Sequence, residues 1–440
     1  MTPLANLSEL LEMLGPPAHL EALVERQELL RFANSRVTYQ HSEERILVRA
    51  RIIRDGRAAW GTTSNLEPAA LLALRERLEK IIGALPRNGT PYLAEQTAAA
   101  SASTYFASTA SATAHDRAGL FRDALEQLPA GATLGGSIAH GVVEHSVANT
   151  NGVARSEQRT RAAAQFIGSL GEQSSFGRAI HRDASALPIQ SVMNEVLAGL
   201  TVLPQRPLEA GTYRALLGPQ AAITLLAIFA QIALGGRQYL DGLSAVSGQM
   251  DEKVVSPLLT LVDDGGDDAG LPTTFDTEGH AKQRVLLVDH GRLAGVVHDA
   301  QTAHRAHGLP TGHAAPPGWR FGADPIPSHL FIDVGSATDG DLLGAVGSGL
   351  AIQRVDYVRV VNARQTLVTG TTRDATQWIQ DGRIVARVPH FRFTLRLTDL
   401  LNCVEAVGSR RERGDSVFME SVVAPAIVVT ALPVQTVVST

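Results

Sequence analysis

Hydrophobic and polar residues alternate with period two in several stretches of the chain, and each such stretch predicts a strand that buries one face. The alternation is clear in Arg45–Ile53 and runs without a break through Phe391–Leu397. Asp55-Gly56, Asn151-Gly152 and Asp381-Gly382 each separate two strand-like stretches. Because such pairs favour tight turns between antiparallel strands, we expect a turn at each of them.

Apolar residues recur at helical spacing in other stretches. This spacing predicts helices over Leu4–Leu14, Ala18–Leu30, Pro68–Leu85 and Ile189–Leu200. The most apolar stretch, Ala221–Leu234, is shorter than the roughly 20 residues that a membrane-spanning helix needs. We therefore expect a buried helix there and no membrane partner.

The pattern as a whole predicts an α+β protein, with an N-terminal α/β lobe built on β-hairpins and a large β-rich C-terminal domain. We expect three domains: an N-terminal α+β domain over residues 1–100, a central α+β domain over 101–205 and a β-rich domain over 206–440. The first boundary falls in a run rich in Ala, Ser and Thr, and the second falls in a Pro-bearing segment.

Composition and charge narrow the class of protein further. A formal net charge of −5 gives no global basic field, so we expect no nucleic-acid partner. The single cysteine, Cys403, excludes an intrachain disulfide and any site built on several thiolates. The first residues lack the basic start of a signal peptide. Together these features predict a cytoplasmic protein.

Common catalytic motifs are absent from the sequence. There is no Gly-Lys pair for a P-loop and no GxSxG for the nucleophile elbow of an α/β-hydrolase. No histidine is followed by glutamate, which excludes HExxH. His140, Glu144 and His145 come nearest to a reversed zinc motif, but their spacing is one residue too long and the stretch is typical of a strand. We expect them to be surface polar positions.

Half of the 14 histidines fall within one segment, which contains His280, His290, His298, His304, His307, His313 and His329. His304 and His307 could chelate a metal ion from one helical turn, with Asp276, Glu278 or Asp299 adding oxygen. The alternative is that these histidines occupy turns and loops between strands. The acidic run 263–268 lacks the spacing of a calcium loop, and we expect a solvated turn there.

Several short motifs follow one another along the chain. Two of them, Arg31–Arg36 and Ala148–Gly152, lie in the N-terminal half, and Thr274–Gly279 (TFDTEG) lies in the C-terminal half. The remaining ones are Ala210–Pro219, Leu259–Asp264, Pro310–His313 and Ile332–Gly335. In this order they resemble the TldD/PmbA family across nearly the whole chain, and Thr274–Gly279 is similar to that family's fD.EG motif.

The resemblance implies a division of labour between two chains. In the catalytic, TldD-type branch one helix carries HExxxH and a Gly-rich C-terminal loop carries a cysteine, so that zinc can be bound. The corresponding helix here, around Ala227–Ile232, and the comparable loop, Arg413–Ser421, contain neither histidine nor cysteine. The chain therefore resembles the PmbA (TldE) branch, the metal-free partner.

The function implied by this resemblance is that of a subunit in a heterodimer. The chain would pair with a TldD-like metallopeptidase subunit, hold no cofactor itself and leave zinc and hydrolysis to its partner. The substrates would be unfolded or small peptides. The Arg-rich, Lys-poor composition fits a setting in natural-product biosynthesis.

Four residues in the matching motifs are expected to line the shared cavity and to contact substrate: Asp276, Glu278, His313 and His329. For Asp276 and Glu278 the alternative is that they fix a turn through backbone hydrogen bonds. Two other functions stay open at this point. One is an independent amide or peptide hydrolase with a metal in the His-rich segment, and the other is a homodimeric protein that binds a peptide or metabolite.

Overall fold

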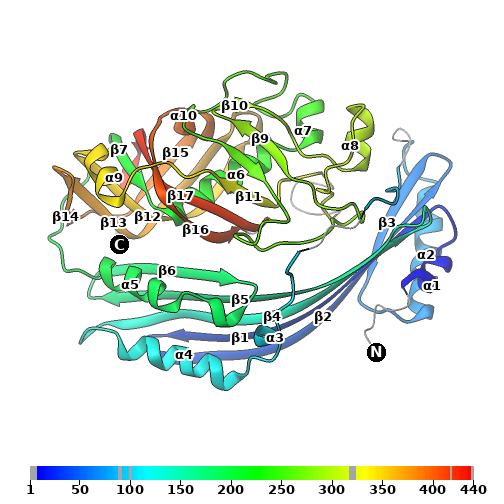
Figure 1. The fold of residues 1–440 in the computed structure, drawn as a ribbon, viewed down its shortest axis with the longest axis horizontal. Helices are drawn as coiled ribbons and strands as arrows, with labels where there is room; N and C mark the ends of the chain where they lie inside the picture. The colour runs from blue at the N-terminus through cyan, green and yellow to red at the C-terminus, as the bar shows by residue number, and fades with distance from the viewer. Residues whose placement is uncertain (1–6, 88–91, 99–101, 317–323, 417–418, 438–440) are drawn as a thin grey trace.

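The computed structural model describes residues 7–87, 92–98, 102–316, 324–416 and 419–437. The strands in these residues form two sheets, and Figure 1 shows the second above the first. The first sheet is antiparallel throughout, in the order β3-β2-β1-β4-β5-β6. Its strands are β1 (Ala18–Ala33), β2 (Arg36–Arg54), β3 (Arg57–Thr63), β4 (Thr133–Asn149), β5 (Ala154–Leu170) and β6 (Gln173–His181).

Helices pack against the first sheet in two groups (Figure 1). The first group is α1 (Leu7–Glu12) and α2 (Pro68–Ile82), and the second is α4 (Ala114–Glu126) and α5 (Ile189–Gly199). Two single turns, α3 (Ala107–Ala110) and η1 (Ala184–Ala186), lie beside the second group. Each group encloses its own cluster of buried apolar side chains, so the sheet carries two separate cores.

The predicted helix over Ala18–Leu30 is wrong, because these residues belong to β1. β1 pairs with β2 on one side and with β4 on the other, so both edges of its backbone are hydrogen-bonded. Leu20 and Val24 enter the core under α1 and α2, while Phe32, on the same face, enters the core under α4 and α5. Strand pairing on two sides outweighs the helical spacing of the apolar residues.

The second sheet has twelve strands within the described residues and contains both parallel and antiparallel pairs. Its central path is β10-β9-β8-β11-β17-β7-β12-β13-β15-β18, with β14 on β13 and β16 on β17. The strands are β7 (Gly211–Leu217), β8 (Leu261–Asp263), β9 (Val285–Asp289), β10 (Arg292–Leu293), β11 (His329–Ile332), β12 (Gly349–Asn362), β13 (Leu367–Gln380), β14 (Arg383–Arg387), β15 (Phe391–Arg396), β16 (Val404–Ser416), β17 (Met419–Val434) and β18 (Thr436–Val437).

The helix α6 (Pro219–Ala233) is the centre of the C-terminal core. It packs on β17, β12 and β16, and its residues are apolar except for Gln220, Thr224 and Gln231. The predicted buried helix is thereby confirmed. The other helices of this half are short: α7 (Gly236–Leu240), α8 (Ala300–Arg305), α9 (Asp339–Val346) and α10 (Leu397–Asn402).

Most other expectations from the sequence hold. The mixed α and β architecture with a large β-rich C-terminal part is confirmed. The three turn pairs lie between β2 and β3, between β4 and β5, and between β13 and β14. Asp55 and Gly56 both have positive φ, 48° and 72°, as the turn of a tight hairpin requires. In the described part of the chain, no helix combines the length and apolarity needed to cross a membrane.

The division into three domains stays a prediction. The boundary after residue 100 lies outside the described residues. The stretches on its two sides contribute strands to one sheet, since β1–β3 precede it and β4–β6 follow it.

Truncating Phe229 in the middle of α6 tests how much the packing of this core contributes to the stability of the C-terminal half. Phe229 is fully buried, so we expect Phe229→Ala to lower the free energy of unfolding by about 3–5 kcal/mol. The measurement is urea unfolding followed by tryptophan fluorescence. Leu309→Ala serves as the control, because Leu309 is 84% exposed and its truncation should change the free energy by less than about 0.5 kcal/mol. Equal shifts for the two variants would contradict the central position of α6.

Candidate functional site

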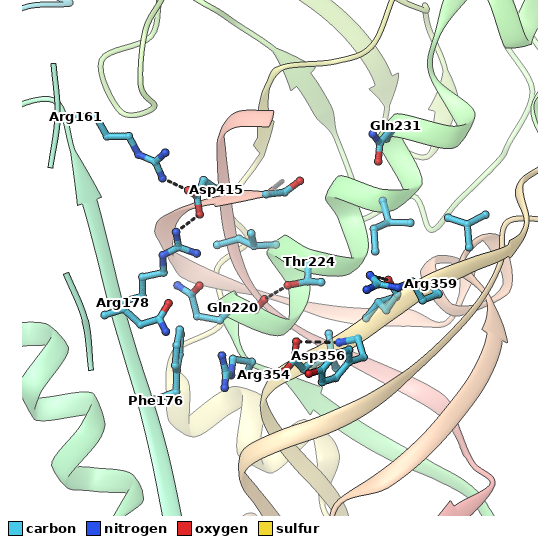
Figure 2. A pocket seen from close by; sticks show the side chains of 18 residues that line it. Arg161, Phe176, Arg178, Gln220, Thr224, Gln231, Arg354, Asp356, Arg359 and Asp415 are labelled. Carbon is cyan, nitrogen blue, oxygen red and sulfur yellow. Dashed lines mark hydrogen bonds and ion pairs between the residues drawn. The ribbon is translucent and has the colours of Figure 1, made fainter. Parts of the chain in front are cut away.

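Two adjoining cavities lie where the first sheet meets the C-terminal half of the chain. The larger has a volume of about 750 Å³ and is bounded by β5, β6, α6, β12 and the end of β16 (Figure 2). We call it the α6 cavity. The smaller, of about 390 Å³, is bounded by β1, β5 and the segments that hold His313 and His329. We call it the histidine cavity. Arg161 and Ser416 line both, so the two are neighbours.

One face of α6 forms a wall of the α6 cavity. Its lining residues recur at helical spacing and are Gln220, Ile223, Thr224, Ile228 and Gln231. The amide nitrogen of Gln220 donates to Glu412 (3.1 Å), and the Thr224 hydroxyl donates to the Gln220 carbonyl (3.0 Å). The amide nitrogen of Gln231 is buried without a hydrogen-bond partner. This wall is therefore neutral, with apolar and amide groups side by side.

The residues of the α6 cavity do not fit a catalytic zinc ion. Zinc sites use imidazole, thiolate and carboxylate groups, and the α6 wall offers none of them. The carboxylates in the lining are Asp415, which pairs with Arg161 and Arg178, and Asp356, which pairs with Arg373 (2.8 Å). Across the described residues, no group of three His, Cys, Asp or Glu side chains could hold a metal ion.

Arginines dominate the end of the α6 cavity next to β6. Arg161 and Arg178 share the Asp415 carboxylate, as Figure 2 shows, and Arg354 lies over the ring of Phe176 at 4.1 Å. Burial, together with the nearby charges of Arg161 and Arg354, lowers the pKa of Arg178 to about 10. The guanidinium stays protonated at neutral pH, in a place where positive charge is in excess.

Three of the four residues predicted to contact substrate line one cavity. Asp276, His313 and His329 all border the histidine cavity. Glu278 does not border it and lies next to the start of α8, where its carboxylate accepts a hydrogen bond from the Ala300 N–H (2.9 Å). That any of the four contacts substrate stays a prediction.

Both oxygens of the Asp276 carboxylate accept hydrogen bonds from backbone N–H groups. One oxygen accepts from the N–H groups of Glu278 (2.9 Å) and His280 (3.0 Å), and the other accepts from the N–H of Ala314 (2.8 Å). These bonds fix the turn after Phe275 and tie it to the segment that follows His313. The turn-fixing alternative raised for this residue is therefore what the hydrogen bonds show.

His313 is held by Asp263, and the expectation of a solvated turn at the acidic run is wrong for that residue. Asp263 is 0% exposed, and its carboxylate bonds to Nε2 of His313 (2.7 Å) and accepts from the N–H groups of Ser328 (2.6 Å) and His329 (2.9 Å). Burial would raise the pKa of Asp263, but His313 and its other partners hold that pKa below its usual range. The pair is a structural anchor of the cavity wall.

His329 is neutral and hydrogen-bonded through both ring nitrogens. Burial and the nearby Lys282 ammonium lower its pKa to about 3. Nε2 lies 3.0 Å from the Leu271 carbonyl, which can only accept, so this nitrogen carries the proton. Nδ1 then accepts from the Ser328 hydroxyl (3.0 Å), which in turn accepts from Lys282 Nζ (2.7 Å).

The sequence missed the charged residues on the cavity face of β1 and its neighbours. Glu21 pairs with Arg49 (2.5 Å) and with His145 (3.1 Å), and Arg159 pairs with Glu420 (3.3 Å). Burial would raise the pKa of Glu420, but Arg159 and other cations lower it to about 2. Charged residues on one face of a strand, such as Glu21 and Glu25 on β1, were the available signal in the sequence. This signal was missed because a helix was predicted for these residues.

His140, Glu144 and His145 do lie on a strand, β4, but their expected place at the surface is wrong. All three are buried, because each finds a charged partner on a neighbouring element. His140 contacts Arg117 of α4, Glu144 pairs with Arg26, and His145 faces Glu21.

Two further expectations concern loops. The stretch Arg413–Ser421 forms the ends of β16 and β17 in a hairpin, apart from residues 417–418, which lie outside the described residues. In the His-rich segment, His304 contacts the Tyr92 hydroxyl (2.9 Å), and His307 has the positive φ of a turn (53°).

Comparison with known proteins identifies relatives of this chain. A family model described as the PmbA/TldA metallopeptidase C-terminal domain matches residues 210–436. A protein of Methanothermobacter thermautotrophicus named metalloprotease is 25% identical over 191 residues, which are 42% of this chain and 41% of that protein. An uncharacterised protein of Methanocaldococcus jannaschii is 30% identical over 100 residues, 22% of this chain and 24% of that protein. Each match spans less than half of the relative's length.

Solved structures resemble the chain over almost its whole length. TldE from Thermococcus kodakarensis has a TM-score of 0.86 and 19% identity, covering 99% of this chain and 100% of that one. A Thermotoga maritima protein, solved as a proposed modulator of DNA gyrase, has a TM-score of 0.83 and 19% identity, covering 98% and 100%. At these identities the likeness establishes the fold.

The carboxyl of Glu278 gives a prediction for the pH dependence of stability. Burial and the neighbouring Asp299 and Asp276 raise its pKa from 4.5 to about 8. Between these two values the folded state binds the proton more tightly than the unfolded state, so this residue's stabilising contribution is lost as pH rises. We expect Glu278→Gln, which keeps an oxygen for the Ala300 N–H, to unfold at higher urea than the parent at pH 9 and to differ little at pH 4.

The control for this prediction is Glu9→Gln, at an exposed position on α1. Its unfolding midpoint should follow that of the parent at every pH. A Glu278→Gln variant whose advantage does not grow between pH 4 and pH 9 would show that folding does not raise the pKa of Glu278.

Proposed function

The chain belongs to the PmbA/TldD metallopeptidase family, and from this premise we propose that it is the metal-free, PmbA (TldE)-type subunit of a two-chain zinc peptidase. It pairs with a TldD-type subunit, which binds zinc and cleaves peptide or amide bonds in unfolded or small peptide substrates. The present chain completes the cavity and holds the substrate.

The face that α6 turns to its cavity carries this proposal. In a zinc peptidase the metal needs three protein ligands, an open position for water and a general base. The α6 wall consists of two isoleucines, a threonine and two glutamines, none of which can take these roles. A cavity of this size, lined by arginine, amide and apolar groups, is nonetheless suited to binding a ligand.

A metal relocated to the His-rich segment would make the chain an independent hydrolase, and the described residues give that alternative no support. His304, His307, His313 and His329 each lie apart from any group of three potential ligands. Both ring nitrogens of His313 and both of His329 are hydrogen-bonded to protein groups. Their part in the proposal is to shape the histidine cavity, beside which the substrate chain would pass.

The setting of the activity is also a proposal. The single cysteine, which leaves no intrachain disulfide, favours the cytoplasm. The Arg-rich composition fits peptide processing in natural-product biosynthesis.

The test is native mass spectrometry with metal analysis of the chain alone and co-expressed with the TldD-type protein encoded near it. We expect the isolated chain to hold less than about 0.1 zinc per molecule, and the co-expressed pair to form a one-to-one complex that holds one zinc and cleaves a fluorogenic peptide. Removing the zinc with a chelator should abolish cleavage, because the metal activates the attacking water.

Two controls sharpen the test. A partner in which the glutamate of HExxxH is replaced by glutamine should still form the complex without cleaving. If the isolated chain held one zinc per molecule and His304→Ala lost it, the proposal would be wrong and the metal site would lie in the His-rich segment. A stable homodimer that ignores the partner would favour a binding protein instead.

A further inference from the structure

We propose that the arginine end of the α6 cavity binds the free C-terminal carboxylate of a peptide chain, so that the subunit reads its substrate from the C-terminus. The inference rests on the proposed function in one respect, because it takes the ligand to be a peptide. It deepens that function by naming the part of the peptide that the chain recognises.

The charge at this end is not balanced within the protein. Arg161 and Arg178 come from β5 and β6 and share one carboxylate, that of Asp415. Arg354 of β12 has its own partner in Asp374 (2.5 Å). Three guanidinium groups therefore face two carboxylates, which leaves one positive charge without a counterion.

Glu420, which is not among the residues that line the α6 cavity, does not cancel this charge. Glu420 lies within electrostatic reach of Arg161, but it is already matched by Arg159 (3.3 Å) and Arg182 (3.9 Å). The lowered pKa of Arg178, caused by burial and by Arg161 and Arg354, agrees with an excess of positive charge. One additional monoanion would neutralise the site.

Two residues that line the same cavity have unused hydrogen-bonding capacity. Gln231 is 3% exposed, lines the cavity and has an amide nitrogen without a partner. Nε of Arg161 is likewise buried without a partner. A buried polar group without a partner costs free energy, and a bound peptide group would remove that cost. Figure 2 shows Arg161 and Gln231 on opposite sides of the cavity, so the ligand would extend between them.

The rest of the lining suits the side chains of a short peptide. Apolar groups from α6 and β12 alternate with the polar ones, and they include Ile223, Ile228, Val355, Val358 and Val360. The cavity volume, about 750 Å³, lies within the range of sites that enclose a ligand of a few residues.

The backbone of the cavity wall is strained where it presents these groups. β12 has register shifts between Ile352 and Arg354 and between Asp356 and Arg359. Tyr357 lies within the second shift and has a φ of 50°. Asp374, the partner of Arg354, has a φ of 58°. Non-glycine residues rarely adopt this backbone conformation, and those that do cluster at binding sites. The bulge leaves Tyr357 at the cavity with 67% of its surface exposed, available to a ligand.

A carboxylate fits this site better than a phosphate. Guanidinium groups form paired hydrogen bonds with either anion, but the site has only one surplus charge and a phosphate monoester carries nearly two.

The experiment measures binding of one N-terminally labelled peptide in three forms to the heterodimer whose zinc has been removed, and to the chain alone, by fluorescence anisotropy. The forms are the free acid, the C-terminal amide, and the amide with glutamate as its last residue. We expect the free acid to bind at least about tenfold more tightly than either amide, because a charge-assisted hydrogen bond contributes about 1.5–3 kcal/mol. Equal binding of acid and amide, or tight binding of the glutamate amide, would overturn the proposal.

Variants locate the effect. Arg178→Gln should remove most of the preference for the acid while leaving the amide unchanged, and Arg178→Lys should retain part of it. Arg122→Gln, on the exposed surface of α4, should behave as the parent. A full acid preference in a folded Arg178→Gln variant would contradict the proposed site.

Native mass spectrometry of the same samples keeps the two proposals apart. If the complex forms but shows no preference for the free acid, only the proposed carboxylate site is contradicted. An acid preference in a chain that forms no complex removes only the subunit role.

Discussion

Arginines of the first sheet need acceptors from the C-terminal half of the chain, and this need fixes how the two halves meet. The Arg182 guanidinium donates to the carbonyls of Leu271 (2.9 Å) and Pro272 (2.7 Å), and Arg161 pairs with Asp415 of β16. In the opposite direction, Arg413 donates to the Ala269 carbonyl (2.6 Å) and to that of Ile180 on β6 (3.3 Å). Since a hydrogen bond to a charged group contributes about 1.5–3 kcal/mol, these contacts hold the two halves together along the cavity walls.

The interface is polar because each half completes its apolar core elsewhere. The first sheet buries one face under its helices, and the second builds its core around α6. The two halves therefore meet through the opposite face of the first sheet, which carries charged residues such as Glu21 in β1 and Arg159 in β5. The two cavities lie at this polar contact between the halves.

Local signals predicted the hairpin turns and the buried helix α6, but they did not predict the strand β1 or the arginine cluster. Asp55-Gly56 and the apolar run of α6 carry their structure in a few neighbouring residues. β1 does not, because its pairing with β4 joins positions more than a hundred residues apart. Family motifs placed Asp276, His313 and His329 in one cavity, whereas the arginine cluster drew on β5, β6 and β12, and no spacing in the sequence joins those. Asp263 shows the same limit, since its acidic neighbours suggested a solvated turn and its partner is 50 residues away.

The α6 wall has a consequence for how such a protein can change over evolutionary time. A helix that must ligate a metal tolerates almost no replacement at its ligand positions, because geometry and chemistry are both fixed. The inward isoleucines here, Ile223 and Ile228, only have to fit a shape. Substitutions along this face can therefore accumulate one at a time, each adjusting the volume or polarity of the cavity, without any intermediate form losing a chemical step.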